Sequence, residues 1–245
     1  MRRRIFPRLS RRCIGMNLRA IEETVGSGLP KYGDRAALLL GAHCMSDKSP
    51  PEIGFWFEFG SPYSYLSMMR IEEAATGLGV RIVWRPFLLG PVFRALGIET
   101  SPVTDNKPKG AYIWQDLPRQ ARKYGLPWTR PSIFPRLGVT PARVALLGAD
   151  QPWVGSFCRR VMALNFAEDR DINEPECLVP VLRELGLPAT LLDEAQADAN
   201  KARLRAQTDE ARARGIFGAP TFFARGEMFW GNDRLDDALL FAANG

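Results

Sequence analysis

The pattern of apolar and polar positions first predicts regular secondary structure near residue 53. Residues 53–59, Ile-Gly-Phe-Trp-Phe-Glu-Phe, are rich in aromatic side chains and predict a β-strand that ends at Gly60. Ser61 and Pro62 are then residue types typical of an N-cap and a first helical position, and apolar residues follow at spacings of three and four. We therefore expect a helix over residues 62–77.

A second β-prone run, residues 80–84, follows that helix, and a strand-helix-strand connection of this length predicts two parallel strands. No strand pattern returns until about residue 200. The segments between are interrupted by proline and glycine, and they predict helices over residues 108–124, 140–149, 152–167, 174–185 and 189–198.

The last part of the chain returns to a mixed pattern. Residues 201–214 predict a charged helix, residues 220–224 and 227–230 predict two strands, and a final helix begins near Asp233. Two strands joined by so short a connection form a β-hairpin. This order of elements is that of an α/β protein with a thioredoxin-like fold, interrupted by a large all-helical insertion.

We divide the chain accordingly. Residues 45–88 and 200–245 form the predicted thioredoxin-like domain, and residues 89–199 form the predicted helical insertion domain. Residues 1–44 show no sustained periodicity, and we expect them to be a disordered basic leader.

The formal net charge of +6 belongs to this leader. Residues 1–44 hold nine of the 33 basic residues and three of the 27 acidic ones, which leaves 24 of each in residues 45–245. A basic protein is ordinarily a candidate for binding nucleic acid or an anionic membrane, but here the predicted folded part is neutral. We therefore expect no nucleic-acid partner. The sequence has no run of about 18 apolar residues, so we also expect no membrane span.

The leader has three interpretations. Its seven arginines within the first nineteen residues and its few acidic residues would suit a transit peptide, and an interaction tail is a second alternative. We prefer a third, in which Met45 is the true initiator and the upstream residues are a mis-called start. Met45 opens a short polar lead, residues 46–52, into the first strand.

The histidine and cysteine content excludes several kinds of active site. The only histidine, His43, lies in the leader, so the predicted folded part has no imidazole for a catalytic triad or a histidine zinc site. The four cysteines are Cys13, Cys44, Cys158 and Cys177, and they show no CxxC spacing. A dithiol redox site and a zinc ribbon are therefore excluded. We expect no metal site, and the expected compartment is the reducing cytoplasm.

Three segments carry a family resemblance. They are residues 57–66 (Phe-Glu-Phe-Gly-Ser-Pro-Tyr-Ser-Tyr-Leu), residues 85–90 (Arg-Pro-Phe-Leu-Leu-Gly), and residues 215–223 (Gly-Ile-Phe-Gly-Ala-Pro-Thr-Phe-Phe) leading into residues 229–235 (Phe-Trp-Gly-Asn-Asp-Arg-Leu). Over residues 53–241, and in this order, the chain resembles the 2-hydroxychromene-2-carboxylate isomerases. This family is grouped with the kappa-class glutathione transferases in the DsbA-like branch of the thioredoxin superfamily.

The resemblance implies a glutathione site. Ser61 stands where thioredoxin-like redox proteins have a reactive cysteine, and in the family this serine stabilises the thiolate of bound glutathione. Ala219 and Pro220 stand at the cis-proline position, where the backbone pairs with glutathione like a short added strand. Asn232 and Asp233 stand where the family binds the γ-glutamyl end. From the residues alone, each position has a structural alternative to glutathione binding. Ser61 and the Asn232-Asp233 pair would serve equally well as helix caps, and Pro220 as an ordinary proline that opens a strand.

The helical insertion supplies further candidates. Lys109, near Asn106, lies where related proteins provide groups for the carboxylate of the thiol or for an aromatic substrate. Aromatic side chains are candidates for an apolar substrate pocket, with plain core packing as the alternative. They are Tyr63, Tyr112, Trp114, Trp128 and Phe134.

The function implied by the resemblance is that of a glutathione-dependent cis-trans isomerase of aromatic, naphthalene-type catabolism. Its substrates would be 2-hydroxychromene-2-carboxylate and trans-o-hydroxybenzylidenepyruvate. Their interconversion needs rotation about a carbon-carbon double bond, which transient addition of a thiolate permits, and glutathione is then regenerated. Two alternatives stay open: a kappa-like glutathione transferase that conjugates an electrophile, and a non-catalytic thioredoxin-like binding module. Because a dimer is common among the relatives, we expect a homodimer that binds glutathione and an aromatic small molecule.

Overall fold

Four strands form one mixed sheet in the computed structural model, which describes residues 50–244 of the chain. The strands are β1 (Glu52–Phe57), β2 (Arg81–Pro86), β3 (Thr221–Ala224) and β4 (Glu227–Trp230), in the order β2-β1-β3-β4. β1 and β2 are parallel, with Phe55 opposite Trp84, whereas β3 is antiparallel to both β1 and β4. The parallel pair and the C-terminal hairpin are as the sequence predicted. The predictions for residues 1–44 lie outside the described residues.

Helices make up most of the remaining described chain. α1 (Pro62–Met68) and α2 (Ile71–Leu78) connect β1 to β2. The segment between β2 and β3 is helical and contains α3 (Leu89–Ala95), α4 (Pro102–Asp105), α5 (Lys107–Lys123), α6 (Val139–Leu147), α7 (Val154–Phe166), α8 (Pro175–Glu184), α9 (Leu191–Gln196) and α10 (Asp198–Ala213). A 3-10 turn (Asn232–Arg234) and α11 (Leu235–Ala243) follow β4. The sheet and its helical segment confirm the predicted fold class, while the domain limits stay a prediction.

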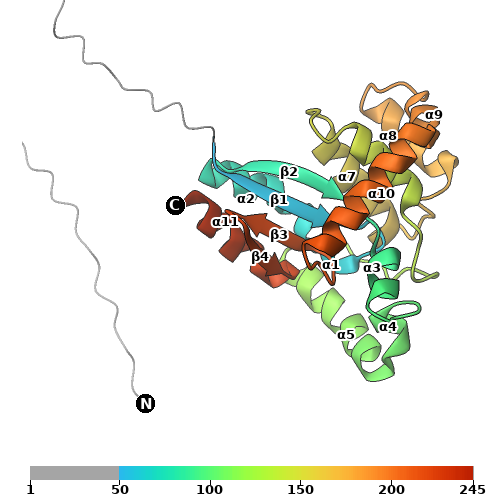
Figure 1. The fold of residues 1–245 in the computed structure, drawn as a ribbon. Helices are drawn as coiled ribbons and strands as arrows, with labels where there is room; N and C mark the ends of the chain where they lie inside the picture. The colour runs from blue at the N-terminus through green and yellow to red at the C-terminus, as the bar shows by residue number, and fades with distance from the viewer. Residues whose placement is uncertain (1–49, 245) are drawn as a thin grey trace, which may run out of the picture. The chain divides into compact units, whose positions relative to one another are not determined.

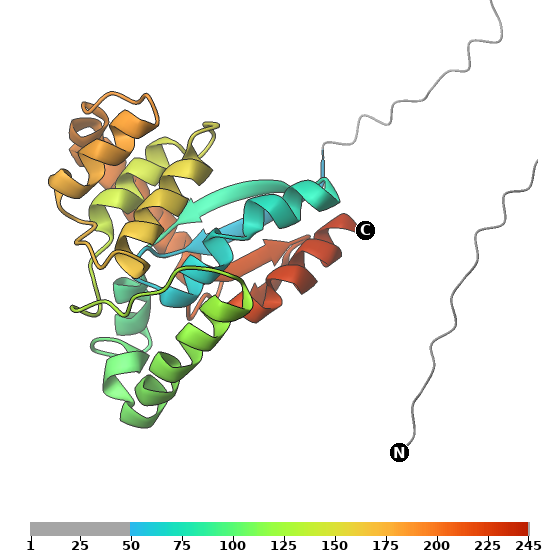
Figure 2. The ribbon, with the colours of Figure 1, turned by 180° about the vertical axis from the view of Figure 1, so that it is seen from behind.

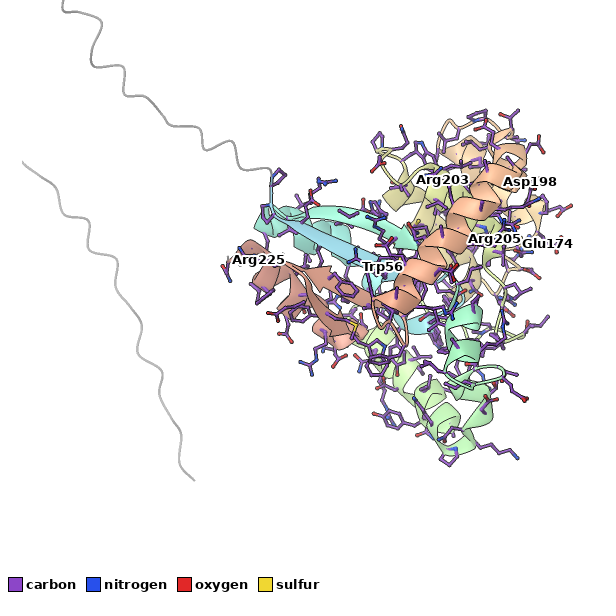
Figure 3. All side chains as sticks on the ribbon, in the orientation of Figure 1. Trp56, Glu174, Asp198, Arg203, Arg205 and Arg225 are labelled. Atoms are coloured by element: carbon purple, nitrogen blue, oxygen red, sulfur yellow. The ribbon has the colours of Figure 1, made fainter. Side chains whose placement is uncertain are left out.

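Helices pack on both faces of the sheet. Figure 1 shows α10 crossing one face, and Figure 2, seen from behind, shows α2 and α11 on the other. Alternate residues of β1 pack against these two layers. Phe55 and Phe57 belong to the main core, where Phe55 stacks on Phe222 with ring centroids 5.3 Å apart. Trp56 packs in a second cluster with Ala211 of α10, and Figure 3 shows it beside the end of that helix. Each fully buried ring of this kind contributes about 1.5–3 kcal/mol.

One local prediction was wrong, and two short helices were not predicted individually. The single helix expected over residues 62–77 is two helices, because the backbone N–H of Arg70 bonds to Ser67 O, only three residues earlier, at 3.1 Å. The Arg70 guanidinium lies 3.9 Å from the centre of the Tyr124 ring and bonds to Asp236, so tertiary contacts override local helix propensity here. The short helices α3 and α4 were also not expected.

The described residues show neither a membrane-spanning element nor a metal cluster. No helix within residues 50–244 is long and apolar enough to cross a bilayer. In the same part of the chain, no group of three or more His, Cys, Asp or Glu side chains lies close enough together to hold a metal ion.

Candidate active site

Ser61 lies in the turn that joins β1 to α1. It is the N-cap of α1, and its Oγ accepts a hydrogen bond from Ser64 N at 3.2 Å. The same hydroxyl donates to Ala219 O at 2.9 Å. Ser61 is 6% exposed, so the hydroxyl of one buried residue both caps the helix and contacts a segment 158 residues away in the sequence.

The Ala219–Pro220 peptide bond is cis, as the family resemblance implied. It lies directly before β3, and Pro220 O accepts a hydrogen bond from Gly231 N at 3.0 Å. The fold therefore brings together Ser61, Ala219 and Pro220, three of the residues expected at the site. The candidate site is centred on this contact between the β1–α1 turn and the start of β3.

Asn232 is buried, and its side chain forms hydrogen bonds within the protein. It is 5% exposed, and its Oδ1 accepts hydrogen bonds from Ser67 Oγ at 3.0 Å and from Arg70 Nη1 at 3.2 Å. Its Nδ2 lies 3.5 Å from the Tyr124 hydroxyl. The amide therefore joins α1, the end of α5 and the turn before α11. The neighbouring Asp233 is exposed.

Lys109 lies in the first turn of α5 and is exposed. Its backbone N–H donates to Asn106 Oδ1 at 3.0 Å, which makes Asn106 the cap of this helix. Within residues 50–244, no hydrogen bond or ion pair joins the Lys109 side chain to Ser61 or Asn232. The structure thus does not bring Lys109 into the contact that unites Ser61 and Ala219.

Sequence reasoning missed that Tyr63, two residues after Ser61, pairs with Asp116. The Tyr63 hydroxyl donates to Asp116 Oδ2, on α5, at 2.9 Å. Burial, the bond to Asp116 and the negative charges of Asp116 and Asp233 all raise the pKa of Tyr63 above its usual range. Two carboxylates, Asp116 and Asp233, therefore lie near Tyr63 in the first turn of α1. Tyr63 was visible as a pocket candidate, but nothing in the sequence pairs it with Asp116.

Glu58 is the second group that sequence reasoning missed. It follows β1 directly, and its Oε2 accepts a hydrogen bond from Gly60 N at 3.0 Å, while its backbone carbonyl accepts one from Ser61 N at 3.0 Å. Burial raises the pKa of this carboxyl from 4.5 to about 7, although the bond from Gly60 opposes the shift. The carboxyl therefore changes charge near neutral pH, and it belongs to the residue three positions before Ser61.

A series of hydrogen-bonded polar side chains from the helical segment contacts the same turn. Asn165 Nδ2, on α7, donates to Phe59 O at 3.0 Å, and Arg136 Nη1 donates to Asn165 Oδ1 at 3.0 Å. The other end of the Arg136 guanidinium forms an ion pair with Asp169. Hydrogen bonds from Ser132 N and from Arg136 lower the pKa of Asp169, so it stays ionised. The backbone just before Ser61 is thereby held by side chains from far along the chain.

Comparison with known proteins identifies the family. A family model described as a DSBA-like thioredoxin domain matches residues 52–240. The chain belongs to the DSBA-like thioredoxin family. One relative of this DSBA-like protein, 2-hydroxychromene-2-carboxylate isomerase from Sphingobium xenophagum, is 33% identical over 187 residues, which cover 75% of this chain and 94% of that protein. The resemblance seen in the three motifs is thus confirmed.

Two further matches place the DSBA-like chain among its relatives. A solved structure of 2-hydroxychromene-2-carboxylate isomerase matches with a TM-score of 0.69 and 28% identity, covering 75% of this chain and 90% of that one. Glutathione S-transferase kappa 1 from Caenorhabditis elegans is 25% identical over 200 residues, which cover 76% of this chain and 88% of that protein.

Proposed function

We propose that this protein is a glutathione-dependent isomerase that interconverts 2-hydroxychromene-2-carboxylate and trans-o-hydroxybenzylidenepyruvate. Similarity to a protein named 2-hydroxychromene-2-carboxylate isomerase, at 33% identity, supports an isomerase-like enzyme. The observation that carries the proposal is the position of Ser61 Oγ, 2.9 Å from Ala219 O and beside the cis bond to Pro220. A hydroxyl there can donate to an external thiolate but cannot carry out disulfide exchange.

The described residues offer suitable partners for the different parts of glutathione. The Ser61 hydroxyl becomes available to a sulfur atom once it turns away from Ala219 O, and that carbonyl is then free to pair with a peptide N–H. Asp116 and Asp233, near Tyr63, are anions that suit the ammonium of the γ-glutamyl end. Lys109 is an exposed cation that suits a carboxylate. The charges of these residues therefore match those of the ligand that the family suggests.

When bound, glutathione supplies a thiolate that adds reversibly to a conjugated double bond and so lets that bond rotate. Ser61 has the task of stabilising the ionised sulfur, because a hydrogen bond to a charged form lowers the pKa of its acid. The protein's own described thiols do not compete for this role. Cys158 and Cys177 are buried, and burial raises the pKa of Cys158 well above its usual value.

A cavity in the helical segment has a lining whose chemistry suits an aromatic acid. A cavity of about 540 Å³ lies beside α4 and α5, and Lys107, Trp114 and Arg130 are among its lining residues. The Arg130 guanidinium lies 4.6 Å from the centre of the Trp114 ring, so cationic and aromatic groups occur together there. Asp116, which bonds to Tyr63, follows this part of α5 directly. We assign the cavity to a substrate that carries both a ring and a carboxylate.

Turnover of the chromene substrate with and without glutathione tests the proposal. We expect turnover only when glutathione is present, with no conjugate detectable by mass spectrometry. Accumulation of a conjugate would favour the alternative of a kappa-like transferase, which the similarity to a kappa transferase supports.

A glutathione-dependent shift of the unfolding temperature separates both enzymes from a non-catalytic module. A ligand at about a hundred times its Kd stabilises the folded state by about 2.7 kcal/mol. Absence of any shift at millimolar glutathione would contradict both enzyme functions. The expected homodimer is checked on the same sample by light scattering.

A further inference from the structure

A hollow of about 220 Å³ lies on the sheet face that α10 crosses, and we call it the sheet hollow. Residues of three strands, of the end of α10 and of the hairpin turn line it, among them Gly54, Trp56, Arg85, Arg214, Phe223 and Arg225. Figure 3 shows Trp56 next to the end of α10 and Arg225 at the other end of the strands. The residues of the Ser61–Ala219 contact are not among its lining. The sheet hollow is therefore a second cavity, separate from the candidate active site.

Gly54 forms the floor of the sheet hollow. Because successive side chains of a strand point to opposite faces, Glu52, Gly54 and Trp56 share one face of β1. Gly54 pairs with Val83 on one side and with Phe223 on the other, so its missing side chain leaves a gap within the sheet surface. A Cβ atom built at Gly54 would lie 3.6 Å from Trp56 Nε1 and 3.7 Å from Phe223 Cβ. These are ordinary contacts, so local packing does not require glycine here.

Two guanidinium groups lie close to the Trp56 ring at one end of the sheet hollow. Arg85 Cζ is 5.8 Å and Arg214 Cζ 5.7 Å from the centre of that ring. Arg214 Cζ is also 5.3 Å from the centre of the Phe223 ring. These distances allow cation–π attraction, which holds a planar guanidinium in place while the N–H groups at its edge stay able to donate hydrogen bonds. Two fixed cations thus border an aromatic surface.

Carboxylates within the described residues neutralise only part of this positive charge. Glu210 accepts a hydrogen bond from Arg214 Nε at 2.8 Å. Glu52 lines the sheet hollow, but it already forms an ion pair with an arginine of β2. Among residues 50–244, neither Arg85 nor Arg225 forms an ion pair. The described lining therefore carries an excess of positive charge, which a bound anion would offset.

We propose that the sheet hollow binds a small aromatic carboxylate. The carboxylate accepts hydrogen bonds from Arg85 and Arg214, and the ring fills the gap over Gly54 against the side chain of Phe223. A volume of about 220 Å³ is below the roughly 300 Å³ at which sites for drug-sized ligands begin, so one or two rings fit better than a nucleotide. This binding uses neither Ser61 nor glutathione, and the inference therefore goes beyond the proposed function.

Calorimetric titration of the full chain with 2-naphthoate tests the site. The cavity beside α5 also offers an arginine and a ring, so the titration is done in Arg130→Gln, which removes the cation of that cavity. We expect one molecule to bind per chain. Adding Arg85→Gln should weaken binding at least about tenfold, because a charge-assisted hydrogen bond is lost. The uncharged 2-naphthalenemethanol should bind at least about tenfold more weakly than 2-naphthoate for the same reason.

Gly54→Val tests the cavity without removing a charge. A Cβ atom there has no contact shorter than 3.6 Å, and valine favours strands, so the variant should fold. Its side chain should fill the gap and block 2-naphthoate although Arg85 and Arg214 are intact. Arg212→Gln is the matched charge control, because Arg212 is an exposed arginine of α10 that bonds to Asp209. It should bind 2-naphthoate as tightly as the protein without this change.

Several results would overturn the inference. If Arg130→Gln no longer bound 2-naphthoate, the ligand would belong to the cavity beside α5. Unchanged affinity in Gly54→Val, or equal affinity for the acid and the alcohol, would remove the sheet hollow or the charge from the interaction. A change of oligomeric state in Gly54→Val, measured by light scattering, would instead make the sheet hollow a contact between subunits. Loss of the proposed isomerase activity has no bearing on these titrations, because they contain no glutathione.

Discussion

Ser61 combines two roles in one hydroxyl, and these roles can be separated by experiment. Because Ser61 caps α1, Ser61→Ala should lower the free energy of unfolding by about 1 kcal/mol and leave the fold intact. If the hydroxyl also stabilises a thiolate, the substitution should reduce turnover at pH 7 by about a hundredfold. Part of the loss should be recovered at higher pH, where the thiol ionises without help.

Urea denaturation and the pH profile of turnover measure these two effects. Ser156→Ala, at a half-buried position of α7 where the hydroxyl accepts a hydrogen bond from Arg159, removes a serine hydroxyl away from the candidate site and should leave turnover and its pH profile unchanged. Turnover that is unchanged in Ser61→Ala would remove the serine from the site and leave it as a helix cap.

Glu58 makes stability depend on pH in a defined direction. Its pKa is raised from 4.5 to about 7 on folding, so the folded state binds the proton more tightly than the unfolded state does. This contribution to stability is fully present below about pH 4.5 and is lost as the pH rises to about 7. Above that pH the contribution of Glu58 no longer changes. The total change is about 3 kcal/mol.

Replacing the carboxyl by a neutral amide removes this dependence. We expect Glu58→Gln to be more stable than the wild type at pH 8 by up to about 3 kcal/mol, and equal to it near pH 4.5. Urea denaturation at the two pH values gives the comparison, with Glu227→Gln as the exposed control. The expectation fails if the difference between wild type and Glu58→Gln is the same at both pH values.

The junction of α1, α5 and the turn before α11 depends on Asn232. Replacing it by alanine leaves Ser67 and the buried side of Arg70 without their shared acceptor, which should lower the free energy of unfolding by about 1–3 kcal/mol. Asp233→Asn changes an exposed neighbour and should alter stability by less than about 0.5 kcal/mol. Under the proposed function, it should weaken glutathione binding instead.

Urea denaturation combined with glutathione titration distinguishes these two neighbours. If Asn232→Ala were as stable as the wild type but bound glutathione more weakly, Asn232 would be a ligand contact and not part of an internal network.

Some of these elements could be predicted from the sequence and others could not. The strands and the start of α1 were predictable because local signals decide them: aromatic runs, a Ser-Pro cap and a close pair of strands. The break at Arg70 and the pairing of Tyr63 with Asp116 were not, because contacts 53 or more residues apart in sequence create them. Glu58 looked like an ordinary polar residue of a strand, since its raised pKa comes from burial in the folded chain.

For the chain as a whole, the described folded part and the formal charge lie in different segments. Within residues 50–244 the core begins at Ile53, and residues 45–245 hold equal numbers of basic and acidic groups. A chain that starts at Met45 should therefore keep the unfolding temperature and the glutathione affinity of the full chain. It should lose retention on a cation exchanger at pH 7, because the +6 charge resides in residues 1–44. Ion-exchange chromatography and thermal denaturation of both chains check this. A lower unfolding temperature of the shorter chain would show that residues 1–44 contribute to the stability of the fold, and that the basic segment is more than an appended charge.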